Sequence, residues 1–512
     1  MEYVIEMNHI TKTFGNFKAL DDVTLKIRKG EVHALLGENG AGKSTLMSVL
    51  FGLYQAEKGE IIINGKSEKI NNPNDANNLD IGMVHQHFKL VHNFTVLESI
   101  ILGRETVKAG ILKKEDARKK VMDLSERYKL KIDPDAYISD ITVGMQQRVE
   151  ILKMLFCDND ILIFDEPTAV LTPQEIEELM KVMKKLVSEG KSIIFISHKL
   201  NEIKEVADRC TILRKGKYIG TVDVSTTTKE QMSEMMVGRK INFNIEKIEA
   251  KRGEAVLEVK NLTIKARNSK KNVVNDVSFE VNKGEIVCIA GIDGNGQSEL
   301  VYGITGLLPI NEGKIILNGI DITKESIRKK CIAGMAHIPE DRHKHGLILD
   351  FDLQQNAVMQ SYYETKFQKL GLIKFNEVRE YAKKLIKQYD IRSPKDEESI
   401  VRNMSGGNQQ KLIIARELDR DPEIVLAVQP TRGLDVGATE YIHKQLIAQR
   451  DGGKAVLLIS LELDEVMEVS DRILVIYEGE IVGDLNPKEI TVKELGLYMA
   501  GSKRGENYGK KA

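Results

Sequence analysis

The chain of 512 residues lacks any apolar stretch long enough to cross a membrane. Its best apolar runs, such as Ile161–Phe164 and Val456–Ile459, have the length of strands. The first residues, MEYVIE, show no basic segment followed by an apolar one, so a secretory signal is not expected. Together these absences predict a cytoplasmic protein.

The chain also lacks paired cysteines and an excess of charge of one sign. Its four cysteines are scattered and no two have a CxxC spacing, so neither a zinc site nor a disulfide framework is predicted. The 75 basic and 76 acidic residues give a net charge of −1, which argues against a dominant polyanion-binding surface. The chain is too long for a single hydrophobic core, and its length predicts two to four domains.

What the chain does contain is an internal duplication. A Gly-Glu-Val tripeptide at 30–32, before a glycine-rich loop at Gly37, recurs 254 residues later as Gly-Glu-Ile at 284–286, before a loop at Gly291. The segment Val143–Arg148 recurs at 406–411, now 263 residues away. A repeat of this length indicates two tandem domains rather than a solenoid.

The duplication sets the expected domain boundaries. The first domain is predicted at 1–239 and the second at 253–501. The charged segment 240–252 between them has no clear periodicity and is the predicted linker. Residues 502–512 are predicted to form a frayed, solvated tail.

Each half is predicted to have an α/β core. Ile161–Phe164 has the pattern of a strand, Pro173–Glu189 that of a helix, and Ser192–Ile196 that of the next strand. Such alternation is typical of a largely parallel sheet covered by helices. The segment 87–140 has a stronger helical pattern, so a helical subdomain is expected to interrupt each core.

The first half contains a phosphate-binding motif. Residues 37–44, GENGAGKS, are the one full match in the chain to G-x-x-x-x-G-K-[ST], between the strand pattern Val32–Leu36 and a helical pattern. The glycines let backbone N–H groups approach phosphate oxygens, Lys43 reaches the β and γ oxygens, and the Ser44 hydroxyl is a magnesium ligand. The alternative, a glycine-rich turn with a surface lysine, is disfavoured by this context.

Two carboxylates follow the strand pattern Ile161–Phe164. One of them, Asp165, can hold the magnesium shell, and the next, Glu166, can orient the attacking water. By itself such a pair is equally typical of a helix cap, but its place downstream of a phosphate loop favours catalysis. His198 is a candidate contact of the γ-phosphate, although a lone histidine more often has a structural role.

With these motifs the chain resembles an ATP-binding cassette (ABC) transporter ATPase, twice over and along nearly its whole length. The resemblance implies two tandem P-loop NTPase domains, each with a RecA-like core, an antiparallel β subdomain and a helical subdomain. It implies ATP and Mg²⁺ as cofactors, Glu166 as catalytic base and His198 as the switch histidine. It also implies that Gln86 is the Q-loop glutamine, which contacts magnesium and water.

The resemblance assigns further residues to the site. The implied magnesium ligands are Ser44, Gln86 and Asp165. The implied nucleotide-binding residues of the first half are Phe14, which stacks on adenine, and Gly37, Glu38, Asn39, Gly40, Ala41, Gly42, Lys43, Ser44 and Thr45. Those of the second half are Ser405, Gly406, Gly407, Asn408 and Asp435.

The second half departs from the family pattern in its phosphate-side motifs. At matching positions, Gln297 replaces Lys43, Val428 and Gln429 replace Asp165 and Glu166, Glu340 replaces Gln86, and Leu461 replaces His198. Its segment 262–268 has no aromatic residue to match Phe14. Nucleotide binding by this half stays open, whereas hydrolysis is not expected.

The signature motif and the D-loop show the opposite pattern. The second half keeps the signature at Met404–Asn408 and the D-loop aspartate at Asp435. The first half has Val143 in place of a glycine that lets the backbone approach phosphate, and its D-loop segment 169–172 has no aspartate. Because the two halves pack head to tail in this family, the intact motifs fall into one composite site and the degenerate motifs into the other. One hydrolytic site is therefore predicted.

Among tandem ABC ATPases, the chain is most similar to importers of the ribose/galactose type. Segments 81–90, 294–300 and 429–435 resemble the nucleoside branch, and a sugar importer is the alternative. The loop Asp341–His345 resembles a PEDR-containing loop of these importers, and it is not a predicted metal cluster. A tandem translation factor would show two intact sites and a long charged linker, and excision-type repair ATPases would need zinc-spaced cysteines.

The resemblance to importers also implies partners and a location. It implies two integral-membrane permease subunits and an extracytoplasmic solute-binding lipoprotein, with no nucleic acid partner. The chain is then expected at the cytoplasmic face of the cell membrane, as a peripheral protein.

Overall fold

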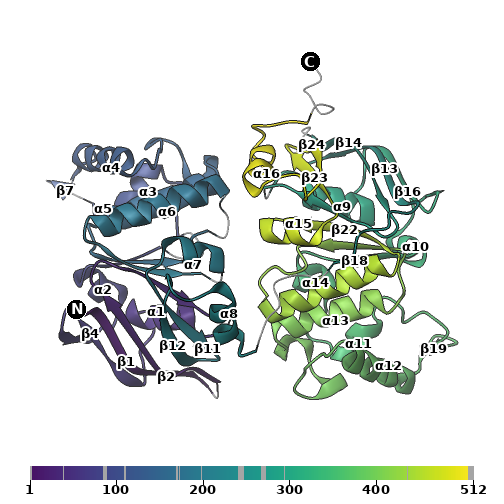
Figure 1. The fold of residues 1–512 in the computed structure, drawn as a ribbon, viewed down its shortest axis with the longest axis horizontal. Coiled ribbons are helices and arrows are strands. Elements are labelled where there is room, and N and C mark those ends of the chain that lie inside the picture. Colours follow the sequence, from purple (N-terminus) through teal and green to yellow (C-terminus); the bar gives the residue numbers. More distant parts are fainter. Residues whose placement is uncertain are drawn as a thin grey trace. The chain divides into compact units, whose positions relative to one another are not determined.

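A computed structural model describes most of the chain. The described residues are 3–15, 17–38, 40–84, 89–105, 107–108, 111–168, 171, 173–197, 199–239, 247–266, 272–292, 294–434 and 436–505. They form two compact units, Met1–Ile241 and Asn242–Ala512, which Figure 1 colours from purple to teal and from teal to yellow. No helix within the described ranges is long and apolar enough to span a membrane.

The first unit contains two large sheets. An antiparallel sheet has the order β2-β1-β4-β5, and a six-stranded sheet, in which all neighbours but β11 and β12 are parallel, has the order β12-β11-β3-β10-β9-β6. The strands are β1 (Tyr3–Phe14), β2 (Phe17–Arg28), β3 (Val32–Leu36), β4 (Lys58–Ile63), β5 (Lys66–Glu68), β6 (Ile81–Val84), β9 (Ile161–Asp165), β10 (Ser192–Ile196), β11 (Arg209–Arg214) and β12 (Lys217–Asp223).

The helices of the first unit fall into two groups. Those of the core are α1 (Lys43–Leu50), α2 (Pro73–Asn78), α6 (Pro173–Ser188), α7 (Leu200–Val206) and α8 (Lys229–Val237). The helical subdomain holds α3 (Val96–Ile101), α4 (Glu115–Tyr128), a 3-10 turn (Ile138–Asp140), α5 (Val143–Phe156) and the short hairpin of β7 (Val107–Lys108) and β8 (Ile111–Leu112).

The second unit repeats this architecture. Its antiparallel sheet has the order β14-β13-β16-β17, and its six-stranded sheet has the order β18-β21-β22-β15-β23-β24. The strands are β13 (Ala255–Lys265), β14 (Asn272–Asn282), β15 (Ile286–Ala290), β16 (Glu312–Leu317), β17 (Ile320–Asp321), β18 (Met335–Ile338), β21 (Ile424–Val428), β22 (Ala455–Ser460), β23 (Arg472–Tyr477) and β24 (Glu480–Leu485).

In the second unit, α13 and α14 lie against the parallel sheet, with α11 and α12 beyond them (Figure 1). The helices are α9 (Gln297–Thr305), α10 (Ile327–Ile332), α11 (Leu353–Val358), α12 (Phe375–Gln388), α13 (Gly406–Leu418), α14 (Val436–Asp451), α15 (Leu463–Val469) and α16 (Val492–Met499). A π-helical turn (Arg342–Gly346), two 3-10 turns (Asp396–Glu398 and Val401–Asn403) and the hairpin of β19 (Gln368–Lys369) and β20 (Leu372–Ile373) complete it.

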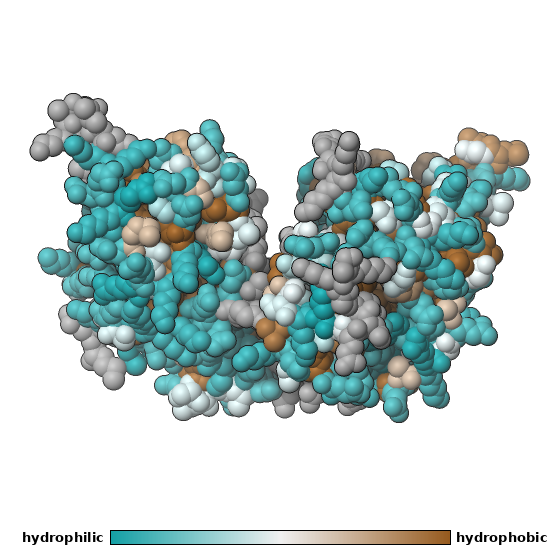
Figure 2. Space-filling view, turned by 90° about the horizontal axis from the view of Figure 1, so that it is seen from above, coloured by the Kyte–Doolittle hydropathy of each residue, from teal (hydrophilic) through white to brown (hydrophobic). Residues whose placement is uncertain are grey.

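Burial explains why these segments take these forms. All five residues of β3, β9 and β15 are buried, as expected for parallel strands with helices on both faces. In β2, by contrast, Val23, Leu25 and Ile27 are buried and alternate with half-buried residues, the pattern of a strand with one covered face. On the face shown in Figure 2, hydrophilic residues cover most of the described surface.

The predicted α/β fold is confirmed, down to individual strands. The predicted strands Val32–Leu36 and Ser192–Ile196 have the bounds of β3 and β10. The predicted helix Pro173–Glu189 is α6, which ends one residue earlier. The helical segment predicted at 87–140 continues beyond that range through α5.

Candidate nucleotide-binding site

The phosphate loop of the first unit joins the end of β3 to the start of α1. Gly37 follows the strand, and a Cβ there would lie 2.6 Å from the Leu213 carbonyl oxygen. Gly42 precedes the helix with φ 102°, where a Cβ would lie 2.7 Å from the Ala19 carbonyl oxygen. Both positions require glycine, because a side chain would collide with the backbone, and at Gly42 the left-handed conformation would also be strained. The result is a bare backbone arch before a helix N-terminus, the form of an anion-binding cradle.

Lys43 lies inside this arch. Its ammonium group donates hydrogen bonds to the carbonyl oxygens of Gly37 (2.6 Å) and Glu38 (3.1 Å), and the residue is only 6% exposed. Burial lowers the pKa of Lys43, and the nearby carboxylates of Glu166 and Asp165 act in the opposite direction. A cation held in a largely dry cradle can offset phosphate charge strongly.

The two predicted carboxylates stand at the end of β9. Asp165 is the last residue of that strand and is buried, and Glu166 follows with φ 46°. The Glu166 amide donates to the Ile196 carbonyl oxygen (3.0 Å), which holds this unusual conformation beside β10. A left-handed glutamate is uncommon and marks a position where the backbone is set by function or packing.

The donor set of the first unit suits a magnesium ion. The hydroxyl of Ser44, in the first turn of α1, is exposed, and Asp165 supplies a carboxylate within electrostatic reach of the same loop. Hard oxygen donors of this kind, completed by phosphate oxygens and water, are what Mg²⁺ prefers.

An aromatic pair lies near the start of the first unit. Phe14, the last residue of β1, is 44% exposed and packs edge to face with Tyr54, with ring centroids 5.2 Å apart. The Lys12 ammonium lies 5.3 Å from the Phe14 ring centroid. Sequence reasoning identified Phe14 but not Tyr54, which lies 40 residues further along the chain and carries no motif.

The second unit keeps the backbone of this site and changes its side chains. Gly296 precedes α9 with φ 101°, almost the value at Gly42. Gln297, in place of Lys43, is 5% exposed and donates from Nε2 to the Ile292 carbonyl oxygen (3.0 Å). Gln429, in place of Glu166, has φ 42°, and its amide donates to the Ile459 carbonyl oxygen (2.7 Å).

Glu340 is the centre of the polar contacts in this second loop. Its carboxylate accepts hydrogen bonds from the Ser298 hydroxyl (2.9 Å) and the Gln429 side-chain amide (3.0 Å). It also forms an ion pair with Arg432. Sequence comparison of the halves identified Glu340 and Gln429 as replacements, but it did not predict that they meet or that Ser298 and Arg432 join them.

The signature segment of the second unit begins α13. Ser405 is its N-cap, and its hydroxyl accepts a hydrogen bond from the Asn408 side-chain amide (2.9 Å). Gly406 and Gly407 form the first turn, and a Cβ on Gly406 would lie 3.2 Å from the Arg342 guanidinium. Within the described residues, no three or more His, Cys, Asp or Glu side chains are grouped so that they could hold a metal ion.

The structure thus places most predicted site residues. In the first unit, Glu38, Gly40 and Ala41 lie in the phosphate loop and Thr45 lies in the first turn of α1, next to Ser44. Four predicted residues lie outside the described ones: Asn39, Gln86, His198 and Asp435.

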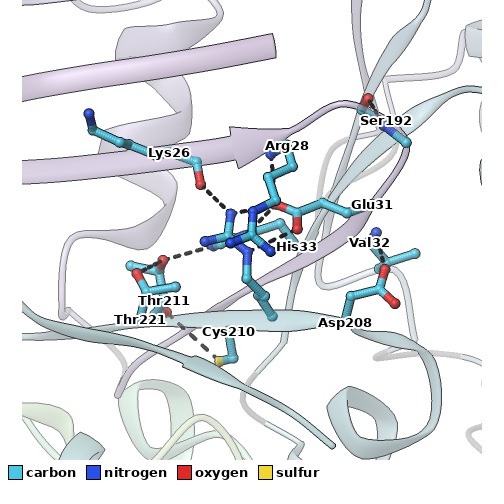
Figure 3. A network of polar contacts seen from close by, with 12 residues as sticks. Lys26, Arg28, Glu31, Val32, His33, Ser192, Asp208, Cys210, Thr211 and Thr221 are labelled. Atoms are coloured by element: carbon cyan, nitrogen blue, oxygen red, sulfur yellow. Dashed lines mark hydrogen bonds and ion pairs between the residues drawn. The ribbon is translucent and has the colours of Figure 1, made fainter. Parts of the chain in front are cut away.

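A buried polar network supports β3 at the end opposite the phosphate loop (Figure 3). The Arg209 guanidinium donates to both carboxylate oxygens of Glu31 (2.7 and 2.9 Å), and His33 is hydrogen-bonded to Glu31 (3.0 Å) and Thr211 (2.7 Å). Burial raises the pKa of Glu31, but these hydrogen bonds outweigh it and lower the pKa to about 2. Burial lowers the pKa of His33, so this side chain is held in its neutral form.

Comparison with known proteins agrees with this geometry. A family model described as ABC transporter matches residues 20–169 and 274–432. The guanosine import ATP-binding protein NupO of Bacillus subtilis is 56% identical over 99% of this chain and 99% of its own. The nucleoside import ATP-binding protein NupA of Lactococcus lactis is 53% identical over the same shares.

Two further similarities are weaker. A putative ribose/galactose/methyl galactoside import ATP-binding protein of Geobacillus kaustophilus is 39% identical over 98% of each chain. Among solved structures, the archaeal ribosome recycling factor aABCE1, in complex with the ribosomal stalk protein aP1, covers 98% of this chain and 94% of its own. Its TM-score is 0.64 at 19% identity, a likeness of fold alone.

Proposed function

The chain belongs to the ABC transporter family as an import ATPase, and from this premise we propose that it hydrolyses ATP to drive nucleoside uptake through membrane permeases. The observation that carries the proposal is the first phosphate loop. There the buried Lys43 lies within electrostatic reach of both Asp165 and Glu166. Cation, backbone cradle and carboxylates together are the parts that phosphoryl transfer requires.

Each residue then has a distinct part in hydrolysis. Lys43 and the loop amides offset the charge on the β and γ oxygens. Glu166 orients the attacking water and accepts its proton as the oxygen–phosphorus bond forms and the β–γ bridge breaks. Ser44, Asp165 and Gln86 would hold Mg²⁺, which when bound adds positive charge beside the β and γ oxygens. His198 would contact the γ-phosphate, and Phe14 would stack on adenine.

We further propose that hydrolysis needs the signature of the second half. The phosphate-side motifs are intact in the first half and degenerate in the second, while Ser405–Asn408 and Asp435 are intact and their first-half counterparts are not. This sorting is expected if intact motifs from both halves serve one ATP. If each half acted alone, each would be missing an essential part.

Nucleosides are the substrate class that the relatives favour. The relatives that are 53–56% identical to this chain are named for guanosine and nucleoside import, whereas the sugar-import relative is 39% identical. Ribose/galactose-type import is the second candidate, because that relative also matches over its full length.

The partners follow from the import role. We propose two integral-membrane permease subunits and an extracytoplasmic solute-binding lipoprotein, with this chain bound to the cytoplasmic face of the membrane. Copurification from gently solubilised native membranes tests this assembly. Two different permeases with a lipoprotein would support it, whereas ribosomes without a membrane partner would contradict it.

Uptake of radiolabelled guanosine and ribose by cells that lack this chain tests the substrate. The wild-type chain should restore guanosine uptake, and the Glu166→Gln variant should not. Restored uptake of ribose alone would favour the sugar candidate. Restoration of neither solute by an active ATPase would contradict the import role.

A further inference from the structure

The residues of the second phosphate loop do not fit a magnesium ion as those of the first do. Val428 stands where the first unit has the carboxylate of Asp165, and it is buried and apolar. Gln429 replaces the second carboxylate and donates its amide hydrogen to Glu340. At the two positions where the first unit has carboxylates, the second unit therefore has no negative charge to offer a metal ion.

Among the described residues, the carboxylate that accepts a hydrogen bond from Ser298 of this loop is already paired with a cation. Glu340 accepts from Ser298, whose counterpart Ser44 is the proposed magnesium ligand of the first unit. The same carboxylate is paired with the guanidinium of Arg432, whose side chain is 58% exposed while that of Glu340 is 17% exposed. A divalent cation placed beside Ser298 would have to displace this guanidinium, because two cations would repel each other there.

The charged side chains described beside the two loops therefore differ. In the first unit, Lys43 lies near the carboxylates of Glu166, Asp165 and Glu38, an excess of negative charge that a divalent ion can offset. In the second unit, Gln297 is neutral and Glu340 and Arg432 neutralise each other. Beside Ser298, the carboxylate of Glu340 therefore has no unpaired negative charge to offer Mg²⁺.

We propose that the Glu340–Arg432 ion pair takes the place of magnesium in the second unit, so that this loop holds nucleotide phosphates without a metal ion. The inference rests on the proposed ATPase function, and it adds that the two loops differ in their need for metal. The paired guanidinium of Arg432 still has N–H groups that can donate to phosphate oxygens, and the loop before α9 supplies backbone donors. A guanidinium binds phosphate but leaves no site for a metal-bound water, so the nucleotide is retained and not hydrolysed.

Binding of ATP to the full-length Lys43→Ala variant tests this proposal. The variant lacks the lysine of the first loop, so the remaining binding reports on the second. Equilibrium dialysis with radiolabelled ATP, in excess Mg²⁺ and in EDTA, should give dissociation constants that agree within about threefold. Binding that requires Mg²⁺ would overturn the proposal, and so would a lack of binding in both media.

Substitution of Arg432 provides a second test in the same background. Without its guanidinium, Glu340 faces the phosphates uncompensated, so Arg432→Ala should weaken binding in EDTA by about tenfold or more, and Mg²⁺ should restore it. Arg379→Ala, which removes another half-exposed arginine–glutamate pair of the same unit, is the matched control and should leave both values unchanged. Thermal unfolding of each variant checks that it is folded. An Arg432→Ala variant indistinguishable from the control would contradict the proposal.

Manganese binding gives an independent readout in the wild-type chain. With saturating ATP, electron paramagnetic resonance should count one bound Mn²⁺ per chain, and two would overturn the proposal. The proposed function fails separately, if the wild-type chain shows no ATPase activity with Mg²⁺. Binding of ATP in EDTA would then still test the inference about the second loop.

Discussion

The two phosphate loops of this chain share a backbone and differ in chemistry. The glycines before α1 and α9 have φ 102° and 101°, and the residues after β9 and β21 have φ 46° and 42°. Yet one loop carries Lys43 with two carboxylates, and the other carries Gln297 with an internal ion pair. The two loops thus keep the same backbone conformation with different side chains, and we propose that these side chains decide which loop supports ATP hydrolysis.

The largest effect is expected from removing the proposed base of the first unit, Glu166. Glu166→Gln keeps the shape of the side chain but cannot accept the proton of the attacking water, so turnover should fall about 10²- to 10⁴-fold. ATP affinity should stay within about threefold of wild type, because the amide removes no contact with the nucleotide. Release of phosphate and binding of ATP measure the two effects.

The matched variant in the second unit is Gln429→Glu. It should leave turnover near the wild-type rate, because this loop also lacks the lysine and the metal carboxylate. A Glu166→Gln variant with normal turnover, or a Gln429→Glu variant that becomes a second hydrolytic centre, would contradict the contrast between the units.

Substitutions in the two signature segments test which of them serves the hydrolytic site. Ser405→Arg places a long side chain at the N-cap of α13, where the backbone should approach phosphate, and should lower turnover by about 10²-fold or more. Thr142→Arg makes the equivalent change at the N-cap of α5 in the first unit and should lower it by less than about twofold. Steady-state ATPase rates of both variants measure the difference. Equal damage by the two substitutions would show that hydrolysis does not depend on the second signature alone.

Removal of the Phe14 ring should have a smaller effect on ATP hydrolysis. Phe14→Ala removes the exposed ring proposed to stack on adenine, and it should raise the KM for ATP about tenfold while kcat changes little. Phe17→Ala, which removes another exposed ring of the same sheet, is the control and should leave both parameters unchanged. A fall in kcat without a change in KM would contradict the stacking role.

The smallest expected effect is on how the free energy of unfolding depends on pH. Burial lowers the pKa of His33 in the folded state, so the unfolded chain takes up a proton first as the pH falls below about 6.5. The free energy of unfolding should then decrease on acidification. Glu31, whose pKa is about 2 when folded, adds a second decrease below about pH 4.5.

The residues of the second unit suggest a variant without the first of these decreases in the free energy of unfolding, the one caused by His33. Its β15 and β23 have Val287 and Leu474 at the positions of His33 and Thr211. The double variant His33→Val, Thr211→Leu should therefore lose less stability than wild type between pH 7 and pH 5, as measured by urea unfolding. Parallel pH profiles for the two proteins would mean that His33 does not titrate on unfolding.

Much of this arrangement could be predicted from the sequence, because it depends on local patterns. The apolar runs that form β3 and β10, and the glycine spacing of the phosphate loop, are readable over a few residues. The pairing of Glu340 with Arg432 joins residues 92 positions apart, and the contact of Phe14 with Tyr54 joins two segments of the first unit. Neither pair has a periodicity or spacing of its own, so only the folded chain reveals them.

Trapping the nucleotide after hydrolysis shows whether the chain has one hydrolytic site. Orthovanadate with radiolabelled ATP should retain one ADP per chain, and cleavage between the two units after photo-crosslinking should place the label on the phosphate loop of the first. Glu166→Gln and Ser405→Arg should each abolish this trapping. Two trapped ADP molecules per chain, or label on the loop before α9, would contradict the account.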